Sequence, residues 1–282
     1  ESAPQEDDES LHLEYRVEAQ DLAHLKYGTS SAESITLSFY VRSNKNGAYA
    51  LGVQSHDADK NIGTTYTVAN TDWQRVTWTI PGLTTSGINN DNGIGFMIKW
   101  FLSAGDNMTS TSNTSWDTNA GNRYAYGQTA DLMAESSNYW EITGVQLELG
   151  SSATPFEHRS YGDELLRCQR YCFKTYAEDA LTEAIGCGYW QATNAAMIYV
   201  YLPVTMSKWP SVTATGSDWY VSYGSNSSAG STVAFNNADI GDTGPVSVVG
   251  IRFGGLSGGT VGHAAAIMSK NADVALFLEN EL

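Results

Sequence analysis

Positive charge, cysteine and long apolar runs are all scarce in this chain of 282 residues, and each scarcity argues against a class of function. The 15 Lys and Arg residues stand against 31 Asp and Glu residues, which gives a net charge of −16. Such a surface repels phosphate backbones and anionic membranes, so we expect no nucleic-acid binding. No apolar run approaches the ~20 residues that span a bilayer, so we expect no membrane insertion.

Cysteine is too sparse for a disulfide framework, because the three residues Cys168, Cys172 and Cys187 are odd in number. Cys168 and Cys172 are four residues apart, so one helix would place both on the same face. A metal site would need about four ligands at close spacing, and no His lies near them in sequence. We therefore expect small buried thiols at these positions.

The chain also lacks the motifs of common catalytic sites. Its five His residues are scattered, with no HExxH spacing, and there is no GxSxG elbow or Walker loop. The stretch IRFGGLSGGT lacks the strand and helix that flank a phosphate-binding loop. Asp and Glu are so common that a glycosidase pair cannot be picked out by position. We expect a protein without enzymatic activity.

What the chain does have is the period-2 alternation of half-buried β-strands. Alternating apolar residues occur at Ile35 to Val41, Val76 to Ile80 and Ile94 to Trp100. Turn sequences such as Asn46-Gly47 and Pro81-Gly82 separate them. Short strands without helices between them predict a β-sandwich. Four tryptophans in strand patterns are candidates for the core: Trp73, Trp78, Trp100 and Trp140.

A strand and a helix are predicted in succession after residue 140. The apolar residues of 140–149 change parity at Gly144, which predicts a β-bulge there. Ser160 can cap a helix, with Asp163 three residues later. Leu165, Cys168, Cys172 and Tyr176 follow helical spacing, which predicts one helix of about four turns.

Alternation returns in the last third of the chain, which predicts a second, smaller β domain. Its expected strands are 197–204, 212–215, 219–223, 245–253, 264–268 and 274–278. The predicted fold is all-β, with an extended lead-in at 1–10, a jelly-roll sandwich at 11–155, a helical junction at 156–178 and a C-terminal β-sandwich at 179–282.

Several of these segments resemble bacteriophage tail-fibre and receptor-binding virion proteins with a carbohydrate-binding-module-like jelly roll. The stretches that carry the resemblance are YGT at 27–29, ITLSFYVRS at 35–43, TDWQRVT at 71–77, WEITGVQLELGSSATPFEHRSYGDELLRCQRYC at 140–172 and LPV with WPSV at 202–212. The resemblance covers about residues 11–282. It is typical of phage virion proteins and does not distinguish between appendages.

The resemblance implies a virion appendage on the outer surface of the particle that binds host-surface carbohydrate. It also implies a homotrimer that contacts other virion proteins. Two alternatives remain: a capsid decoration or head-fibre protein with a mainly structural role, and a carbohydrate-active accessory protein. No cofactor is expected apart from a structural calcium ion, which sugar-binding jelly rolls often carry. Asp57, Asp59 and Asp91 offer suitable oxygen ligands.

The candidate glycan site lies in the long polar stretch 103–137, because long irregular connections often carry function. Aromatic rings can stack on pyranose faces, and carboxylates and amides can bond the sugar hydroxyls. The residues expected to bind glycan are Trp116, Asp117, Asn122, Tyr124 and Tyr126. The alternative interpretation is that these aromatic residues anchor the loop onto the sandwich or pack against a neighbouring chain.

Overall fold

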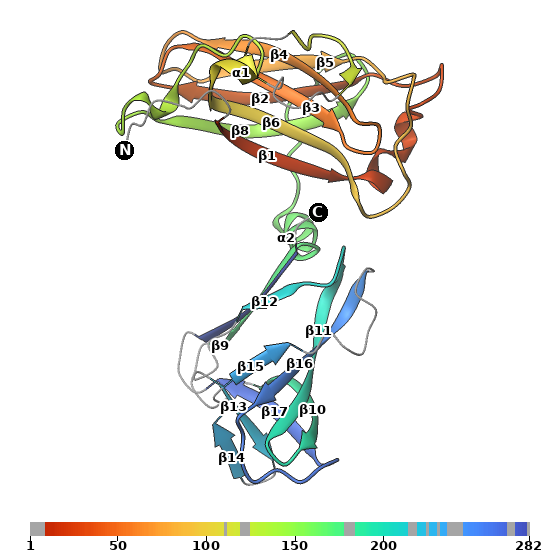
Figure 1. Cartoon of the computed structure of the whole chain (residues 1–282), viewed down its shortest axis with the longest axis vertical. Helices are drawn as coiled ribbons and strands as arrows, with labels where there is room; N and C mark the ends of the chain where they lie inside the picture. Colours follow the sequence, from red (N-terminus) through yellow and green to blue (C-terminus); the bar gives the residue numbers. More distant parts are fainter. Residues whose placement is uncertain are drawn as a thin grey trace. The chain divides into compact units, whose positions relative to one another are not determined.

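The computed structural model describes residues 9–109, 112–118, 125–177, 184–213, 219–223, 226–229, 232–235, 245–269 and 274–280. The chain divides into two compact units, with the boundary between His158 and Arg159. Both units are built from antiparallel sheets, which confirms the predicted all-β class (Figure 1). None of the helices within these ranges combines the length and apolar character needed to cross a membrane.

The N-terminal unit consists of two sheets. Sheet A has the order β1 (Ser10–Glu18), β6 (Ile94–Ala104), β3 (Gly47–Ser55), β4 (Lys60–Val68) and β7 (Asp117–Thr118). Sheet B has the order β5 (Gln74–Ile80), β2 (Ile35–Ser43) and β8 (Trp140–Leu149). The short helices are the 3₁₀ helices η1 (Ala19–Leu25) and η2 (Leu132–Ala134) and the α-helix α1 (Asp106–Thr109).

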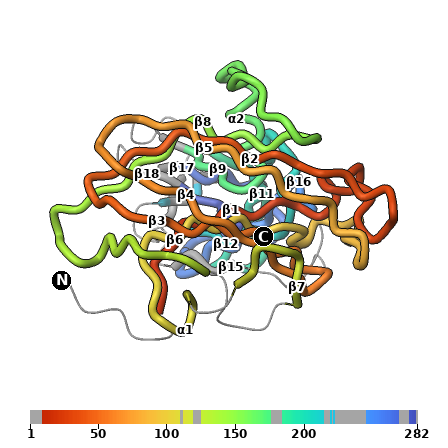
Figure 2. Tube along the Cα trace, turned by 90° about the horizontal axis from the view of Figure 1, so that it is seen from above, coloured from red at the N-terminus to blue at the C-terminus, as the bar shows by residue number. Residues whose placement is uncertain are grey.

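The two sheets pack face to face because each strand buries alternate side chains. Ile35, Leu37, Phe39 and Val41 of β2 are all at most 2% exposed, as the alternation predicts. They share one core with residues of β3, β4 and β6. In Figure 2 strands β2, β5 and β8 lie to one side of the unit and β1, β3 and β6 to the other. The chain passes repeatedly between the sheets, as in a jelly roll.

The predicted β-bulge at Gly144 is confirmed. Between Ser38 and Tyr40, the pairing of β2 with β8 shifts from Gln146 to Thr143, so β8 carries one extra residue. Gly144 has φ +58°, a left-handed conformation that glycine adopts without steric cost. The bulge returns the apolar residues of β8 to the core-facing side, which explains the parity change in the sequence.

After β8 the chain folds back over the outer face of sheet B. Thr79 Oγ1 donates to Ser151 O at 3.2 Å, and Glu157 N donates to Gln146 Oε1 at 2.7 Å. Between these two contacts, Thr154 bonds to Arg75, Gln146 and Glu148. We call residues 151–157 the strap, because side chains from β5 and β8 hold it.

The helix after the strap is shorter than predicted. α2 spans Tyr161–Gln169, and Ser160 caps it by accepting from Asp163 N at 3.2 Å, as expected. Strand β9 (Cys172–Ala177) then begins, so the prediction that Cys172 and Tyr176 continue the helix is wrong. The physical reason is that β9 pairs with β18 in the C-terminal unit, from Cys172↔Glu279 to Ala177↔Val274.

The C-terminal unit also contains two sheets. The larger has the order β14 (Asn226–Ala229), β13 (Trp219–Tyr223), β17 (Ala264–Ser269), β10 (Ala184–Ala192), β11 (Ala195–Met206), β16 (Val246–Gly254) and β15 (Thr232–Phe235). The smaller has the order β12 (Ser211–Thr213), β18 (Val274–Glu279) and β9. Trp190 and Trp219 are both 0% exposed in a core shared by the two sheets.

Two predictions about burial are wrong. All three cysteines are exposed: Cys168 lies on helix α2, which has no buried residue, and Cys172 and Cys187 lie on strands. Trp73, expected in the core, is 43% exposed because it lies just before β5, where it meets the guanidinium of Arg42 at 4.9 Å from its ring centroid. Trp100 is 2% exposed, as predicted.

Candidate functional site

The outer face of sheet A gathers polar side chains around a small hollow. In the β3–β4 pair, Val53 and Ile62 face the core, so the flanking pairs Gly52↔Gly63 and Gln54↔Asn61 face outward. On β6, Lys99 lies between the core residues Ile98 and Trp100 and also faces outward. The alternation of three neighbouring strands therefore gathers these polar side chains on one surface.

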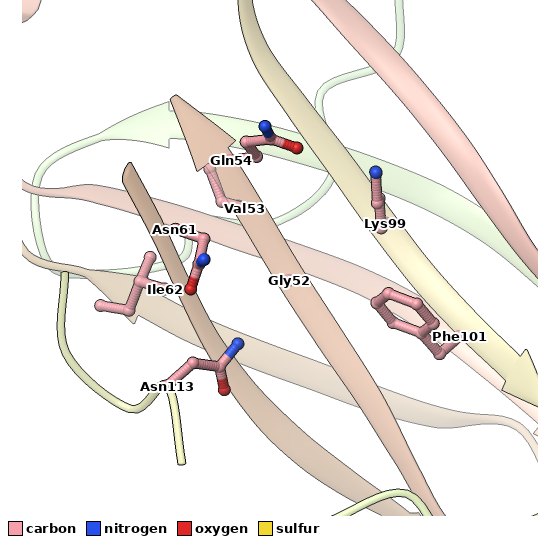
Figure 3. A pocket seen from close by; sticks show the side chains of 8 residues that line it. All are labelled: Gly52, Val53, Gln54, Asn61, Ile62, Lys99, Phe101 and Asn113. Atoms are coloured by element: carbon pink, nitrogen blue, oxygen red, sulfur yellow. The ribbon is translucent and has the colours of Figure 1, made fainter. Parts of the chain in front are cut away.

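A small hollow lies on this surface, and Figure 3 shows its walls. It encloses about 180 Å³, counting space that is open to solvent. Its lining residues are Gly52, Val53, Gln54, Asn61, Ile62, Lys99, Phe101 and Asn113. None of this space is wide enough to hold a water molecule. The hollow is therefore a shallow dip in the surface, and any ligand would lie over it rather than inside it.

A pair of glycines and an asparagine from the long loop shape the hollow. Gly63 N donates to Asn113 O at 2.7 Å, which ties the loop to β4. A Cβ on Gly63 would lie 2.6 Å from Asn113 Nδ2, so the amide of Asn113 occupies the space that a side chain would fill. Glycine at position 63 is thus required for Asn113 to lie against the sheet.

Two amide groups in this hollow are buried without full hydrogen bonding. Asn61 is 3% exposed and Asn113 is 5% exposed. Within the described part of the chain, Asn61 Oδ1 and Asn113 Nδ2 have no hydrogen-bond partner. Leaving a buried polar atom unsatisfied costs roughly 1–3 kcal/mol. One acceptor and one donor without a partner in the described chain therefore lie at the same hollow, and both are buried from solvent.

Charged groups continue along the outer face toward β1. Lys99 Nζ lies 3.3 Å from Glu14 Oε2, and Arg16 Nε donates to Glu14 Oε1 at 2.6 Å. Burial opposes ionisation of Glu14, but Arg16 and Lys99 outweigh it, so the pKa of Glu14 lies below its usual value. Burial and the nearby Lys99 lower the pKa of His12, against the opposing effect of Glu14. At neutral pH this region therefore carries a neutral imidazole beside an ionised carboxylate.

Of the predicted glycan-binding residues, Trp116, Asp117 and Tyr126 are among the described residues. The Trp116 ring packs against the core near Tyr27 and Phe96, at centroid distances of 6.2 and 6.4 Å. Its Nε1 donates to Pro81 O at 2.7 Å. These contacts are those of the alternative interpretation, in which the aromatic residue anchors the loop.

The other predicted residues are less constrained. Asp117 is exposed and pairs with Asn61 between β7 and β4, so it lies at the edge of sheet A beside the hollow. Tyr126 is 39% exposed. Asn122 and Tyr124 lie outside the described residues. Glycan binding by these residues stays a prediction.

Sequence reasoning missed Gln54, Asn61 and Lys99. Each occupies an ordinary outward position of a strand, where a polar residue carries no special signal. Only the strand register brings them together, and the sequence does not reveal register directly. Asn113 belongs to the loop that the sequence did single out.

Two of the three predicted calcium ligands, Asp57 and Asp91, accept hydrogen bonds from within the chain. Asp57 accepts from Asn89 N at 3.0 Å and Asn89 Nδ2 at 2.8 Å, and Asp91 accepts from Gly93 N at 2.9 Å. Across the ranges given above, no group of three or more His, Cys, Asp or Glu side chains is placed to hold a metal ion. Calcium binding stays a prediction.

The comparisons with known proteins add no relative. No protein-family model matches the chain. No curated protein is similar to it in sequence. The residues and their geometry, together with the resemblance of the segments at 27–43, 71–77, 140–172 and 202–212, therefore provide the support for a function.

Proposed function

We propose that this chain is a non-enzymatic virion appendage of a bacteriophage, a tail fibre or receptor-binding protein that recognises host-surface glycan. The observation that carries the binding part of the proposal is the pair of buried, incompletely bonded amides, Asn61 and Asn113, at the hollow of sheet A. Sugar hydroxyls both donate and accept hydrogen bonds, so they complement a free acceptor beside a free donor.

The composition of the hollow supports binding rather than hydrolysis. Its walls present the amides Gln54, Asn61 and Asn113, the ammonium of Lys99 and apolar groups. A glycosidase site needs two carboxyl groups on either side of the scissile bond, and the lining residues include none. An appendage of this kind holds its ligand without changing it.

The virion location rests on the resemblance of the sequence segments, above all residues 140–172. The proposal includes a homotrimer and contacts with other virion proteins, as that resemblance implies. A shallow hollow makes few contacts, so we expect weak binding at each site. Linking several sites raises avidity by ~10²–10⁴ where the geometry allows simultaneous binding.

The first test compares two glutamine variants of the full chain. Gln54→Ala removes a wall of the hollow, while Gln74→Ala removes the same side chain from sheet B, where it donates to Thr67 O at 2.6 Å. We expect Gln54→Ala to lower glycan-array and host-cell adsorption signals several-fold and Gln74→Ala to leave them unchanged. Equal signals from both variants and the wild type would exclude the hollow as the glycan site.

A second variant separates binding from folding. Asn61→Ala removes an acceptor that has no partner within the described chain, so folding should lose little while the hollow loses a sugar-bonding group. We expect weaker glycan binding with an unchanged unfolding transition. Retained binding by Asn61→Ala and Gln54→Ala, with loss by Trp116→Phe, would favour the loop instead. Trp116→Phe is the loop variant of choice because it keeps a packed ring.

The virion part has its own test. Labelled antibody against this chain should decorate the tail of the particle in electron micrographs. Label confined to the capsid would instead favour the decoration or head-fibre alternative. A fall in the viscosity of a polysaccharide solution on incubation with the purified chain would support the alternative that the chain is a carbohydrate-active accessory protein.

A further inference from the structure

Strand β1 forms an open edge of sheet A. Within the described residues its nine positions, Ser10–Glu18, are hydrogen-bonded to β6 on one side and have no strand on the other. An edge strand of this length offers a row of backbone donors and acceptors to another strand. Proteins commonly shield such edges or use them for β-strand addition.

The side chains of β1 that point toward the core side remain exposed. Leu13 pairs with Trp100 and Tyr15 with Ile98, and both partners belong to the buried core. Yet Leu11, Leu13 and Tyr15 are 38%, 43% and 59% exposed. Three large apolar side chains in alternate positions therefore form an apolar stripe that is only partly covered.

The opposite side of β1 is polar and ordered. Glu14 contacts Arg16 at 2.6 Å and Lys99 at 3.3 Å, and His12 Nε2 lies 3.9 Å from Glu14. A strand that adds to this edge must therefore supply apolar side chains on one face and polar ones on the other, in strict alternation. Residues 1–8, ESAPQEDD, offer no large apolar side chain, so this part of the chain does not fit that description.

We propose that β1 pairs antiparallel with β1 of a second copy of this chain, about a two-fold axis at Leu13. In that register Leu13 faces Leu13, and Leu11 faces Tyr15, so the three exposed apolar residues match one another. On the other face His12 lies opposite Glu14, where an imidazole N–H can donate to the carboxylate. The sequence of β1 is thus complementary to itself.

Neighbouring registers fit less well. In a two-fold antiparallel pair, residues directly opposite each other point to the same face of the sheet. The two-fold axis must therefore pass through a residue, and it can shift only by whole residues. An axis at Glu14 places Glu14 against Glu14 and His12 against Arg16. An axis at Tyr15 places His12 opposite Glu18, which is 1% exposed and therefore unavailable.

The test measures the mass of the full chain by sedimentation equilibrium at about 0.15 M salt, where repulsion between the acidic chains is screened beyond roughly 8 Å. Leu13→Lys sets two ammonium groups against each other across the axis, so we expect its mass to be half that of the wild type. Val261→Lys, at an apolar residue 60% exposed in the C-terminal unit, should keep the wild-type mass. A mass of Leu13→Lys that is half the wild-type mass would show a two-fold contact, whether or not the chain also forms trimers.

Cross-linking locates the axis. The background has Cys168, Cys172 and Cys187 changed to Ser. In it, the cysteine of Leu13→Cys lies opposite the same cysteine of the second copy, whereas the cysteine of Tyr15→Cys lies opposite Leu11 of the second copy. Oxidation should therefore link Leu13→Cys chains in pairs and leave Tyr15→Cys chains unlinked. A wild type with the same mass as Leu13→Lys, or the absence of cross-links from Leu13→Cys, would overturn the proposal. Glycan binding by a wild type that does not pair would leave the proposed function standing.

Discussion

At the residue scale, the buried amides at the hollow of sheet A lower the stability of the fold. Asn61 and Asn113 each bury more than nine-tenths of their surface while one amide atom of each has no partner in the described chain. An apolar residue of similar size at either position would avoid that cost. Such a local disagreement between side chain and environment is expected where a protein binds a ligand.

The exposed cysteines give a residue-scale prediction. Partial burial, followed by the negative charge of Glu279 and the neighbouring Cys168, raises the pKa of Cys172. A smaller thiolate fraction slows alkylation, because the thiolate is the nucleophile. We therefore expect Glu279→Gln to speed the modification of Cys172 by iodoacetamide near pH 8, measured on peptides by mass spectrometry.

Glu141→Gln is the matched control, because Glu141 lies in the N-terminal unit, where it bonds to Arg42. Its substitution should leave the rate at Cys172 unchanged. A rate at Cys172 that does not respond to Glu279→Gln would show that the charge of Glu279 does not influence this thiol.

The site itself could be predicted from the sequence only in part. Asn113 lies in the polar loop that composition identified, whereas Gln54, Asn61 and Lys99 sit in strands among many similar polar residues. Their meeting depends on the registers Gln54↔Asn61 and Gly52↔Lys99. Register follows from the packing of the whole sheet, so no local pattern could have revealed the hollow.

At the element scale, two glycines should respond in opposite ways to alanine. Gly144 has φ +58°, and its Cβ would lie 3.1 Å from Tyr40 Cδ2, so Gly144→Ala should destabilise the N-terminal unit by about 1–2 kcal/mol. Gly162 lies in α2 with no atom within 4 Å of its Cβ position. Gly162→Ala should stabilise the helix by up to about 1 kcal/mol. Urea unfolding measures both, and destabilisation by both would contradict this account.

The cap of α2 should decide whether that helix is formed. The nine-residue helix has no buried residue, and helices this short are marginal without support. Ser160→Ala removes the acceptor for Asp163 N and should cost about 1 kcal/mol. We expect faster amide hydrogen exchange over residues 161–169. Ser160→Thr keeps an acceptor and should exchange at close to the wild-type rate.

Sequence patterns predicted elements well where one period was unambiguous. The alternation at Ile35 to Val41 and the parity change at Gly144 both confirm this, because a half-buried strand leaves a period of two. The segment after Ser160 was ambiguous. Cys168, Cys172 and Tyr176 fit helical spacing, but Cys172 and Tyr176 are also on one face of a strand. Pairing with β18, which lies about a hundred residues away in sequence, decided between the two.

At the scale of the whole molecule, buried tyrosines should make the N-terminal unit sensitive to alkali. Burial raises the pKa values of Tyr27, Tyr49 and Tyr66 above the usual range. In the unfolded chain these groups ionise near pH 10, so stability is complete below about pH 10 and falls as the pH rises further. The slope is about 1.4 kcal/mol per pH unit for each group.

Urea unfolding between about pH 9 and 11 measures this slope, with the range set by the ordinary tyrosine pKa. Tyr66→Phe should make it shallower. Tyr201→Phe, at a side chain 75% exposed in the C-terminal unit, should leave it as in the wild type. If Tyr66→Phe and the wild type show the same slope, ionisation of Tyr66 does not contribute to alkaline unfolding.

The strap has a mechanical consequence. The chain leaves the sandwich only after Thr154 and Glu157 have bonded to side chains of β5 and β8. Tension applied from the C-terminal side would load these hydrogen bonds before it reached the backbone ladder of β8. Each bond contributes about 1 kcal/mol, so together they resist the pull before the sandwich does. The strap would bear a pull on the chain before the strands of the jelly roll do.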